Sequence, residues 1–197
     1  DDIASASVEE KSKRRGIAGM IFVFKIAGAI AETRASLDEV FKTTSEANNN
    51  IRTLGVALSP CILPEAGKPT FEIGSDEIEI GMGIHGEPGI KREKLKPANE
   101  LVDDLYKRII NDSKISENDT IAVMINSLGA TPLEELYIVS KRLTENFSKS
   151  KINKIKTYVG RYATSMEMAG FSITAIKLND NLSKFLFADS ECPFWTK

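Results

Sequence analysis

Helical and strand-like patterns alternate along the second half of this chain, and the alternation limits the fold more than any single motif does. Two stretches, 98–111 and 131–148, repeat apolar residues at helical spacing. Apolar runs of strand length occur at Thr120–Asn126, Ile155–Tyr162 and Phe171–Leu178. Strands that alternate with helices in this way predict an α/β domain, in which packed helices cover a β-sheet.

The first half of the chain predicts two helices and a hairpin. Residues 16–33 are apolar on several sides at helical spacing, and a capping box that opens at Ser36 begins a helix expected over 37–49. Phe71–Ile73 and Glu77–Gly81 flank a glycine-containing turn, which we interpret as a β-hairpin. An antiparallel hairpin followed by alternating strands and helices predicts a mixed β-sheet.

Further local patterns give shorter elements. Leu54–Leu58 reads as a strand, whereas Gly81–Pro97 is rich in glycine and proline and is expected to be a loop without regular structure. Thr131 and Thr164 each precede a glutamate by three residues, which predicts two more capping boxes. The second box is expected to open a short helical turn at Ser165–Ala169.

Composition narrows the classes of function. A net charge of −2, with 42% hydrophobic and 27% charged residues, gives no positive field for nucleic acid, and the basic run 11–15 is interpreted as a solvated helix start. The most apolar run, Ile17–Ala31, is shorter than the ~20 residues of a membrane span and contains Lys25. Cys61 and Cys192 have no metal-ligand spacing and the chain has one histidine, so we expect no metal site. Reduced thiols and a cytoplasmic location are the expectation.

The glycine-rich segment 81–89 contains that histidine, His85. Its glycines match the GxGxxG spacing of dinucleotide-binding proteins, but Pro88 and Gly89 follow where a helix would have to begin. An ordinary imidazole is mostly neutral near pH 7 and can act as nucleophile or base, and Glu87 is close enough in sequence to orient it. The residues alone leave a structural and a functional role for His85 equally open.

Two other segments, Asn126–Leu133 and Gly160–Gly170, each read as a strand, a turn and the start of a helix. Backbone N–H groups at such a helix start can bind an anion. A plain strand-to-helix connection also explains each of the two segments. From the residues alone, this plain connection is favoured over an anion site.

Several motifs occur together in a fixed order. They are Arg14–Gly19, Lys25–Ala29, Gly55–Cys61, Ala66–Pro69, Glu79–Gly89, Leu128–Pro132 and Glu167–Thr174. Over nearly the whole chain they resemble the carboxy-terminal part of the substrate-binding (K) subunit of dihydroxyacetone kinases. The Ile-His-Gly-Glu-Pro-Gly motif is the specific part of the resemblance. The resemblance implies the second domain of that two-domain fold, with residues 1–35 joining or belonging to the first domain and 36–197 forming an α/β domain.

The resemblance also implies a chemistry. In the family, the histidine that corresponds to His85 forms a covalent hemiaminal with dihydroxyacetone, and the surrounding loop, here Gly83, Gly86 and Glu87, binds the substrate. The implied enzyme is dihydroxyacetone kinase (glycerone kinase), which makes dihydroxyacetone phosphate. The phosphoryl group is expected from a phosphoenolpyruvate-dependent phosphotransferase relay, because no nucleotide-binding domain is appended; ATP as the direct source is the other alternative.

The implied partners follow from the same resemblance. No cofactor is expected on this chain; ADP or ATP with magnesium is expected on a separate nucleotide-binding kinase subunit, and the complete subunit is expected to be a homodimer. The family's upstream glycine-rich motif and its aspartate base are absent, and the chain opens with Asp1 rather than methionine. We therefore expect a fragment of a longer protein, inactive in isolation. A dihydroxyacetone sensor that coactivates a transcription regulator is the alternative, and a fatty-acid-binding protein of related fold is less favoured.

Overall fold

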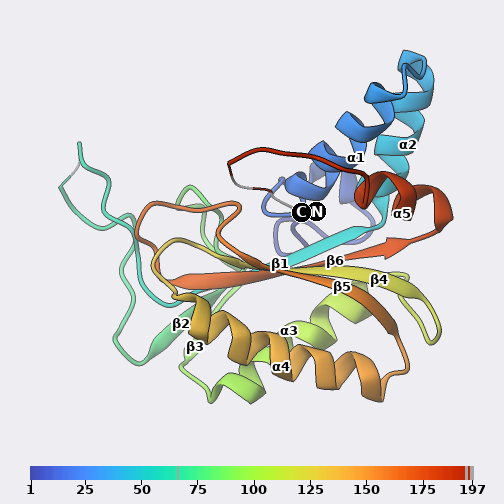
Figure 1. Ribbon diagram of the computed structural model, residues 1–197. Helices are drawn as coiled ribbons and strands as arrows, with labels where there is room; N and C mark the ends of the chain where they lie inside the picture. Colours follow the sequence, from blue (N-terminus) through green and yellow to red (C-terminus); the bar gives the residue numbers. More distant parts are fainter. Residues whose placement is uncertain (66, 194, 196–197) are drawn as a thin grey trace.

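The computed structural model describes residues 1–65, 67–193 and 195. Within them one six-stranded sheet has the order β3-β2-β1-β6-β4-β5. The strands are β1 (Ile51–Ala57), β2 (Glu77–Ile80), β3 (Lys91–Lys94), β4 (Thr120–Ser127), β5 (Asn153–Gly160) and β6 (Gly170–Leu178). The helices are α1 (Met20–Glu32), α2 (Leu37–Asn49), α3 (Ala98–Asp112), α4 (Leu133–Lys149) and α5 (Asp180–Leu186). Figure 1 shows α1, α2 and α5 on one face of the sheet and α3 and α4 on the other.

The predicted mixed sheet is confirmed. β4 and β5 are parallel, whereas β6 pairs antiparallel with both β1 and β4. Because side chains alternate across a strand, the central strands contribute to two cores. On β4, Ile121, Val123 and Ile125 pack toward α3 and α4. Ala122 and Met124 pack toward α1 and α5. Burial on both faces explains why β4 and β6 read as continuous apolar runs.

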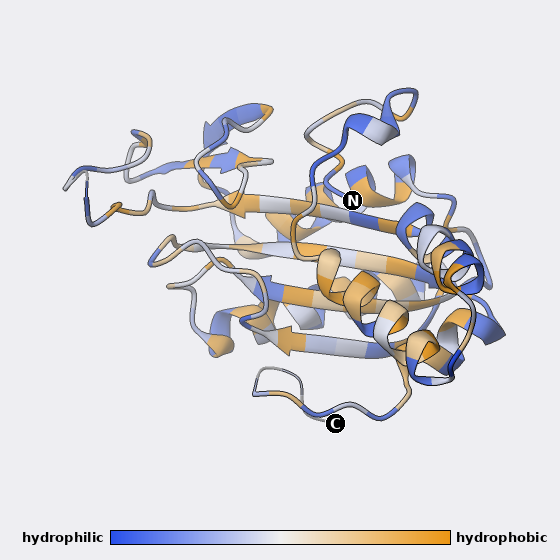
Figure 2. Ribbon diagram, turned by 90° about the horizontal axis from the view of Figure 1, so that it is seen from above, coloured by the Kyte–Doolittle hydropathy of each residue, from blue (hydrophilic) through white to orange (hydrophobic). Residues whose placement is uncertain are grey.

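The predicted hairpin is wrong. β2 pairs with β1 and with β3, and Phe71–Ile73 is not a strand. β3 lies inside the stretch Gly81–Pro97 that was expected to lack regular structure. Its sequence, Lys-Arg-Glu-Lys, has no apolar alternation because it forms the edge of the sheet, where three of its four charged residues are exposed. Figure 2 shows it as a hydrophilic strand at that edge.

The predicted helix starts had mixed outcomes. The Ser36 capping box is confirmed, since the Ser36 Oγ accepts from the Glu39 N–H and the Glu39 carboxylate accepts from the Ser36 N–H. The Thr131 box is wrong: α4 begins after Pro132, and the buried Thr131 hydroxyl accepts from the Gly170 N–H at 2.7 Å. The Thr131 side chain, which the local pattern predicted to cap α4, is used in a tertiary hydrogen bond instead.

Two other differences concern the last part of the chain. Ser165–Ala169 contains no helix, because the Glu167 carboxylate accepts from the Ile62 N–H of a distant loop rather than closing a cap. α5 was not predicted; the side chain of Asn179 caps its start by accepting from the Leu182 N–H. Four residues included in the predicted motifs and domain lie outside the described residues. They are Ala66, Phe194, Thr196 and Lys197.

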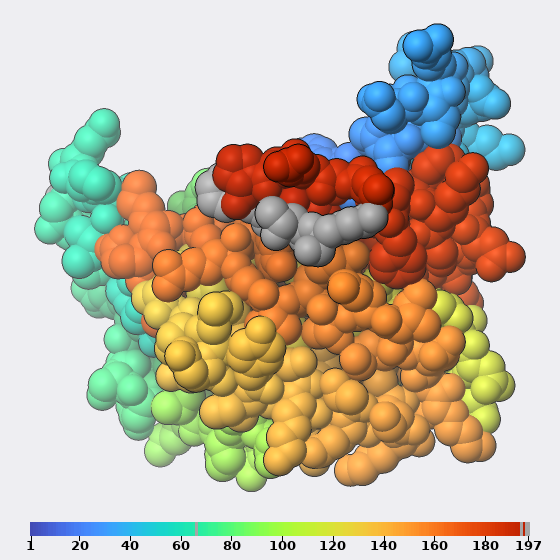
Figure 3. Space-filling view, in the orientation of Figure 1, coloured from blue at the N-terminus to red at the C-terminus, as the bar shows by residue number. Residues whose placement is uncertain are grey.

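α1 shares its core with the sheet. Phe22 and Ile26 are fully buried and belong to the same cluster as Met124 and Ile176. The division of the chain at residues 35 and 36 stays a prediction, but the buried residues of α1 share a core with the sheet. The α1–α2 pair and the loop around residues 59–75 project from opposite ends of the molecule (Figure 3).

Candidate functional site

The histidine loop follows β2 at one end of the sheet. The Gly81 N–H donates to the Gly55 carbonyl at 2.8 Å, with Gly81 at a φ of +79°. A methyl group built on Gly81 would overlap the Cβ of Ala4, so only glycine fits there. The Gly83 N–H then donates to the Glu87 carbonyl at 3.0 Å. This bond closes a tight turn, and His85 lies at its tip.

His85 is exposed and is oriented by its neighbour. The side chain is 79% exposed, and its Nδ1 lies 3.4 Å from Glu87 Oε1. The other oxygen, Glu87 Oε2, accepts a short hydrogen bond from the His85 backbone N–H. Because Nδ1 faces the carboxylate, Nε2 is the ring nitrogen directed away from it. A neutral ring with its proton on Nδ1 carries its lone pair on Nε2.

The electrostatic surroundings keep Glu87 ionised. Partial burial raises the pKa of Glu87, but hydrogen bonds from a backbone N–H and from His85, together with the charge of Arg15, outweigh burial. The net effect is a pKa for Glu87 below its ordinary value. An ionised carboxylate is a hydrogen-bond acceptor, which is the state that can hold the Nδ1 proton of His85.

The other segments singled out from the sequence meet this loop at the same end of the sheet. Met82 packs in a small cluster with Leu128 and Met168. A Cβ on Gly86 would lie 3.5 Å from Thr70 Cβ. The loops around residues 61–71, 81–89, 128–131 and 163–170 therefore converge.

The turn after β4 does not favour an anion site. Its N–H groups donate within the protein: Leu128 to the Gly170 carbonyl, Ala130 to the Met168 carbonyl, and Gly129 to the Ser127 hydroxyl. The plain connection between strand and helix accounts for this segment.

Only the first part of the basic run before α1 is a solvated helix: Lys11–Lys13 form the short 3-10 helix η1, which has no buried residue, whereas the two arginines bind within the protein. The Arg14 guanidinium is 4% exposed and binds both carboxylate oxygens of Asp112, while Arg15 binds Asp2 and the Gly81 carbonyl. Sequence reasoning missed Arg15 because its partners are 13 and 66 positions away, and no local pattern records such contacts.

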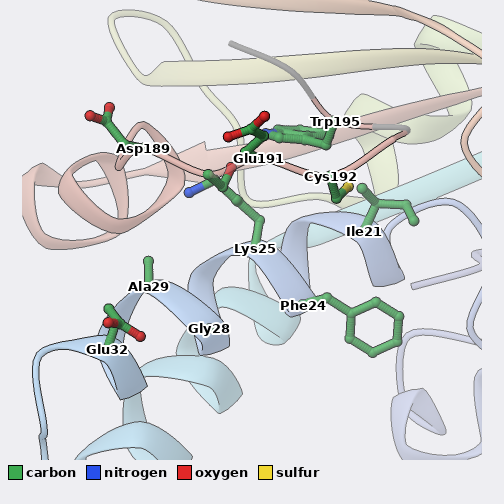
Figure 4. A pocket seen from close by; sticks show the side chains of 11 residues that line it. Ile21, Phe24, Lys25, Gly28, Ala29, Glu32, Asp189, Glu191, Cys192 and Trp195 are labelled. Carbon is green, nitrogen blue, oxygen red and sulfur yellow. The ribbon is translucent and has the colours of Figure 1, made fainter.

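A separate cavity of about 480 Å³ lies between α1 on one side and residues 189–192 and Trp195 on the other. Figure 4 shows Lys25 reaching into it from α1, and its ammonium donates to the Ala188 carbonyl at 2.6 Å and the Phe185 carbonyl at 3.3 Å. The cavity includes none of the predicted site residues. In the described part of the chain, no cluster of three or more His, Cys, Asp and Glu could hold a metal ion. Its helices are too short or too polar to span a membrane.

Comparisons with known proteins agree on one family. The Dak1 domain matches residues 1–194. The chain is 48% identical over 180 residues to "PTS-dependent dihydroxyacetone kinase 1, dihydroxyacetone-binding subunit DhaK" of Listeria innocua, covering 91% of this chain and 55% of that protein.

Two solved structures share the fold. The native dihydroxyacetone kinase of C. freundii has a TM-score of 0.86 and 33% identity, covering 100% of this chain and 35% of that one. The dihydroxyacetone kinase operon co-activator Dha-DhaQ has a TM-score of 0.84 and 33% identity, covering 94% and 57%. The chain spans little more than half the length of the L. innocua relative. Matched by the family over residues 1–194 and sharing this fold, the chain belongs to the Dak1 domain family.

Proposed function

We propose that this chain is the substrate-holding part of a dihydroxyacetone kinase and that His85 anchors dihydroxyacetone covalently. The observation that carries the proposal is the exposed imidazole at the tip of a glycine-rich turn, with Glu87 facing its Nδ1. Gly83 and Gly86 complete the substrate-binding loop. The relative named as a dihydroxyacetone-binding subunit, 48% identical, supports the same substrate.

The proposed chemistry is a reversible addition. The lone pair of His85 Nε2 forms a bond to the carbonyl carbon, while the carbonyl π pair moves onto its oxygen, which takes up a proton. The ring gives its Nδ1 proton to the Glu87 carboxylate, which releases it to water, while water supplies the proton on the oxygen. The net change is the addition of N–H across C=O. The product is a hemiaminal, and no oxidant or reductant is involved. Glycerol has no carbonyl group and forms no such adduct.

Covalent anchoring holds a small, featureless triose in one orientation. Its contribution to phosphorylation is to position one hydroxyl group for transfer, which reduces the entropic part of the barrier. A separate nucleotide-binding subunit would hold ADP or ATP with magnesium, and the group transferred would be the γ-phosphoryl group of ATP. The hydroxyl proton leaves to a base outside this chain. The name of the Listeria relative, "PTS-dependent", favours a phosphoenolpyruvate relay over direct use of ATP.

The remaining expectations belong to the same proposal. The complete subunit is a cytoplasmic homodimer, and the 197-residue chain alone transfers no phosphate. The family's coactivators give a second candidate, a dihydroxyacetone sensor, favoured by the TM-score of 0.84 to the co-activator. A sensor forms the adduct but makes no dihydroxyacetone phosphate with the nucleotide-binding subunit, and this assay separates the two.

Carbon NMR of dihydroxyacetone labelled at its carbonyl tests the anchor. Added to the complete parent protein, the label is expected to move from the ketone region to the tetrahedral region. The His85→Ala variant should leave it in the ketone region, and Glu87→Gln should weaken the adduct without abolishing it. A tetrahedral signal that persists in His85→Ala would assign the adduct to another residue. Absence of that signal in the parent protein would refute the hemiaminal.

A further inference from the structure

Arg15 connects the start of the chain to the loop that carries His85. Its Nε donates to Asp2 Oδ2 at 2.7 Å, and its Nη2 donates to the Gly81 carbonyl at 2.8 Å. Asp2 is fully buried, and its other oxygen accepts from the Ala4 N–H at 3.0 Å. The guanidinium is therefore fixed on a buried anion and holds the residue at which the loop begins.

The remaining nitrogen of Arg15, Nη1, and the Glu87 carboxylate both lie beside Gly83. A methyl group built on Gly83 would overlap Glu87 Oε2 and would lie 2.8 Å from Arg15 Nη1. The guanidinium and the carboxylate are thus neighbours over the same glycine, and only a residue without a side chain leaves room for both. The charge of Arg15 also contributes to lowering the pKa of Glu87, as expected where opposite charges attract each other. Arg15 therefore favours the position in which Glu87 faces the His85 ring.

We propose that Arg15 is a positioning residue for His85, acting through the Gly81 carbonyl and the Glu87 carboxylate. With the carboxylate held against Nδ1, the ring keeps Nε2 directed toward solvent and toward an incoming carbonyl group. The effect on the ring follows from the contacts of this chain alone. The consequence for binding dihydroxyacetone rests on the proposed function.

The adjacent arginine provides a matched control. Arg14 binds Asp112 with two hydrogen bonds of 2.7 and 2.6 Å and donates to the Ala6 carbonyl at 2.9 Å. Both arginines therefore stabilise the N-terminal segment, but only Arg15 reaches the histidine loop. A purely structural role for Arg15 predicts that variants at the two positions behave alike.

Labelling with ¹⁵N-histidine tests the positioning role directly, because His85 is the only histidine of the chain. One backbone amide and one pair of ring nitrogens are observed. Arg15→Gln is expected to move the ring signals toward those of Glu87→Gln and to speed exchange of the His85 amide at least about tenfold. Arg15→Lys should fall between, because one ammonium cannot reproduce the two directed hydrogen bonds of the guanidinium. Arg14→Lys should lower Tm and leave both signals in place.

Unchanged His85 signals in Arg15→Gln would overturn the proposal. If Arg15→Gln does not fold, the comparison of Arg15→Lys with Arg14→Lys decides: equal His85 signals in the two variants refute the positioning role.

Adduct formation in the complete parent protein separates this inference from the proposed function. Arg15→Gln is expected to raise the apparent Kd for dihydroxyacetone about tenfold, which corresponds to 1.4 kcal/mol. An equal Kd in both proteins would overturn the role in substrate binding. If the unaltered parent protein forms no adduct while the ¹⁵N signals still respond to Arg15→Gln, the proposed function fails and the positioning of His85 by Arg15 stands.

Discussion

Replacing Phe22 by alanine tests whether α1 belongs to the core of this domain. The Phe22 side chain is fully buried, and its ring meets Tyr158 of β5 edge-on, with centroids 5.7 Å apart. Truncating a phenylalanine at such a site removes apolar burial and leaves a cavity, at a cost of about 3–5 kcal/mol. With a urea m-value of about 2 kcal/mol/M, the midpoint should fall by roughly 1.5–2.5 M.

The control lies two residues further along the same helix. Phe24 is 65% exposed, so Phe24→Ala should change the free energy of unfolding by no more than about 0.5 kcal/mol. Urea unfolding of the 197-residue chain, followed by circular dichroism, measures the free energy of unfolding of both variants. The two variants replace the same residue type in the same helix. Equal, small losses for Phe22→Ala and Phe24→Ala would refute the reasoning. They would favour the division at residue 35, in which α1 only joins this domain to another.

Two further predictions concern ion pairs. Asp112→Asn should cost about 3–5 kcal/mol of stability in urea unfolding, because it leaves the buried guanidinium groups of Arg14 and Arg52 without their anion. Asp104→Asn, on the surface of the same helix, should cost no more than about 1 kcal/mol, and equal losses would contradict the argument. Hydrogen bonds from an arginine and an asparagine of α4 lower the pKa of Asp103 from 3.8 to about 2. Its contribution, on the order of 1 kcal/mol in this partly exposed pair, is complete above pH 4 and is lost as pH falls toward 2. The unfolding free energies of the parent chain and Asp103→Asn should therefore converge over that interval, and a constant difference would refute the assignment.

The central elements could be predicted because their signals are local. In buried strands such as β4 and amphipathic helices such as α3 and α4, the spacing of the apolar residues indicates which faces are buried. β3 shows no such spacing, since its four residues are all charged. Its pairing with β2 is made by the backbone, which no side-chain pattern in the sequence indicates. The predicted strand at Phe71–Ile73 failed for the complementary reason: apolar residues next to a turn also suit a loop that packs on its neighbours, as Phe71 does.

For the candidate site, too, the local part could be predicted from the sequence and the long-range contacts could not. His85 and Glu87 are two residues apart, and their proximity can be read from the sequence. The contacts that hold the loop are long-range. Arg15 donates hydrogen bonds to Asp2 and to the Gly81 carbonyl, and its Nη1 lies close to Gly83. A run of five basic and polar residues carries no sign of which side chains are buried. In this chain the two arginines of the run, Arg14 and Arg15, are largely enclosed.

Orientation and enclosure of the histidine have separate origins. The position of the ring is set within this chain, by Glu87 and by the N-terminal segment through Arg15. Its exposed fraction of 79% means that the described residues do little to exclude water from it. A covalent adduct and a phosphoryl transfer both benefit from exclusion of water. Variants that disturb orientation should therefore change the His85 signals of this chain by itself. Tight binding of dihydroxyacetone is expected only where the complete protein covers the ring.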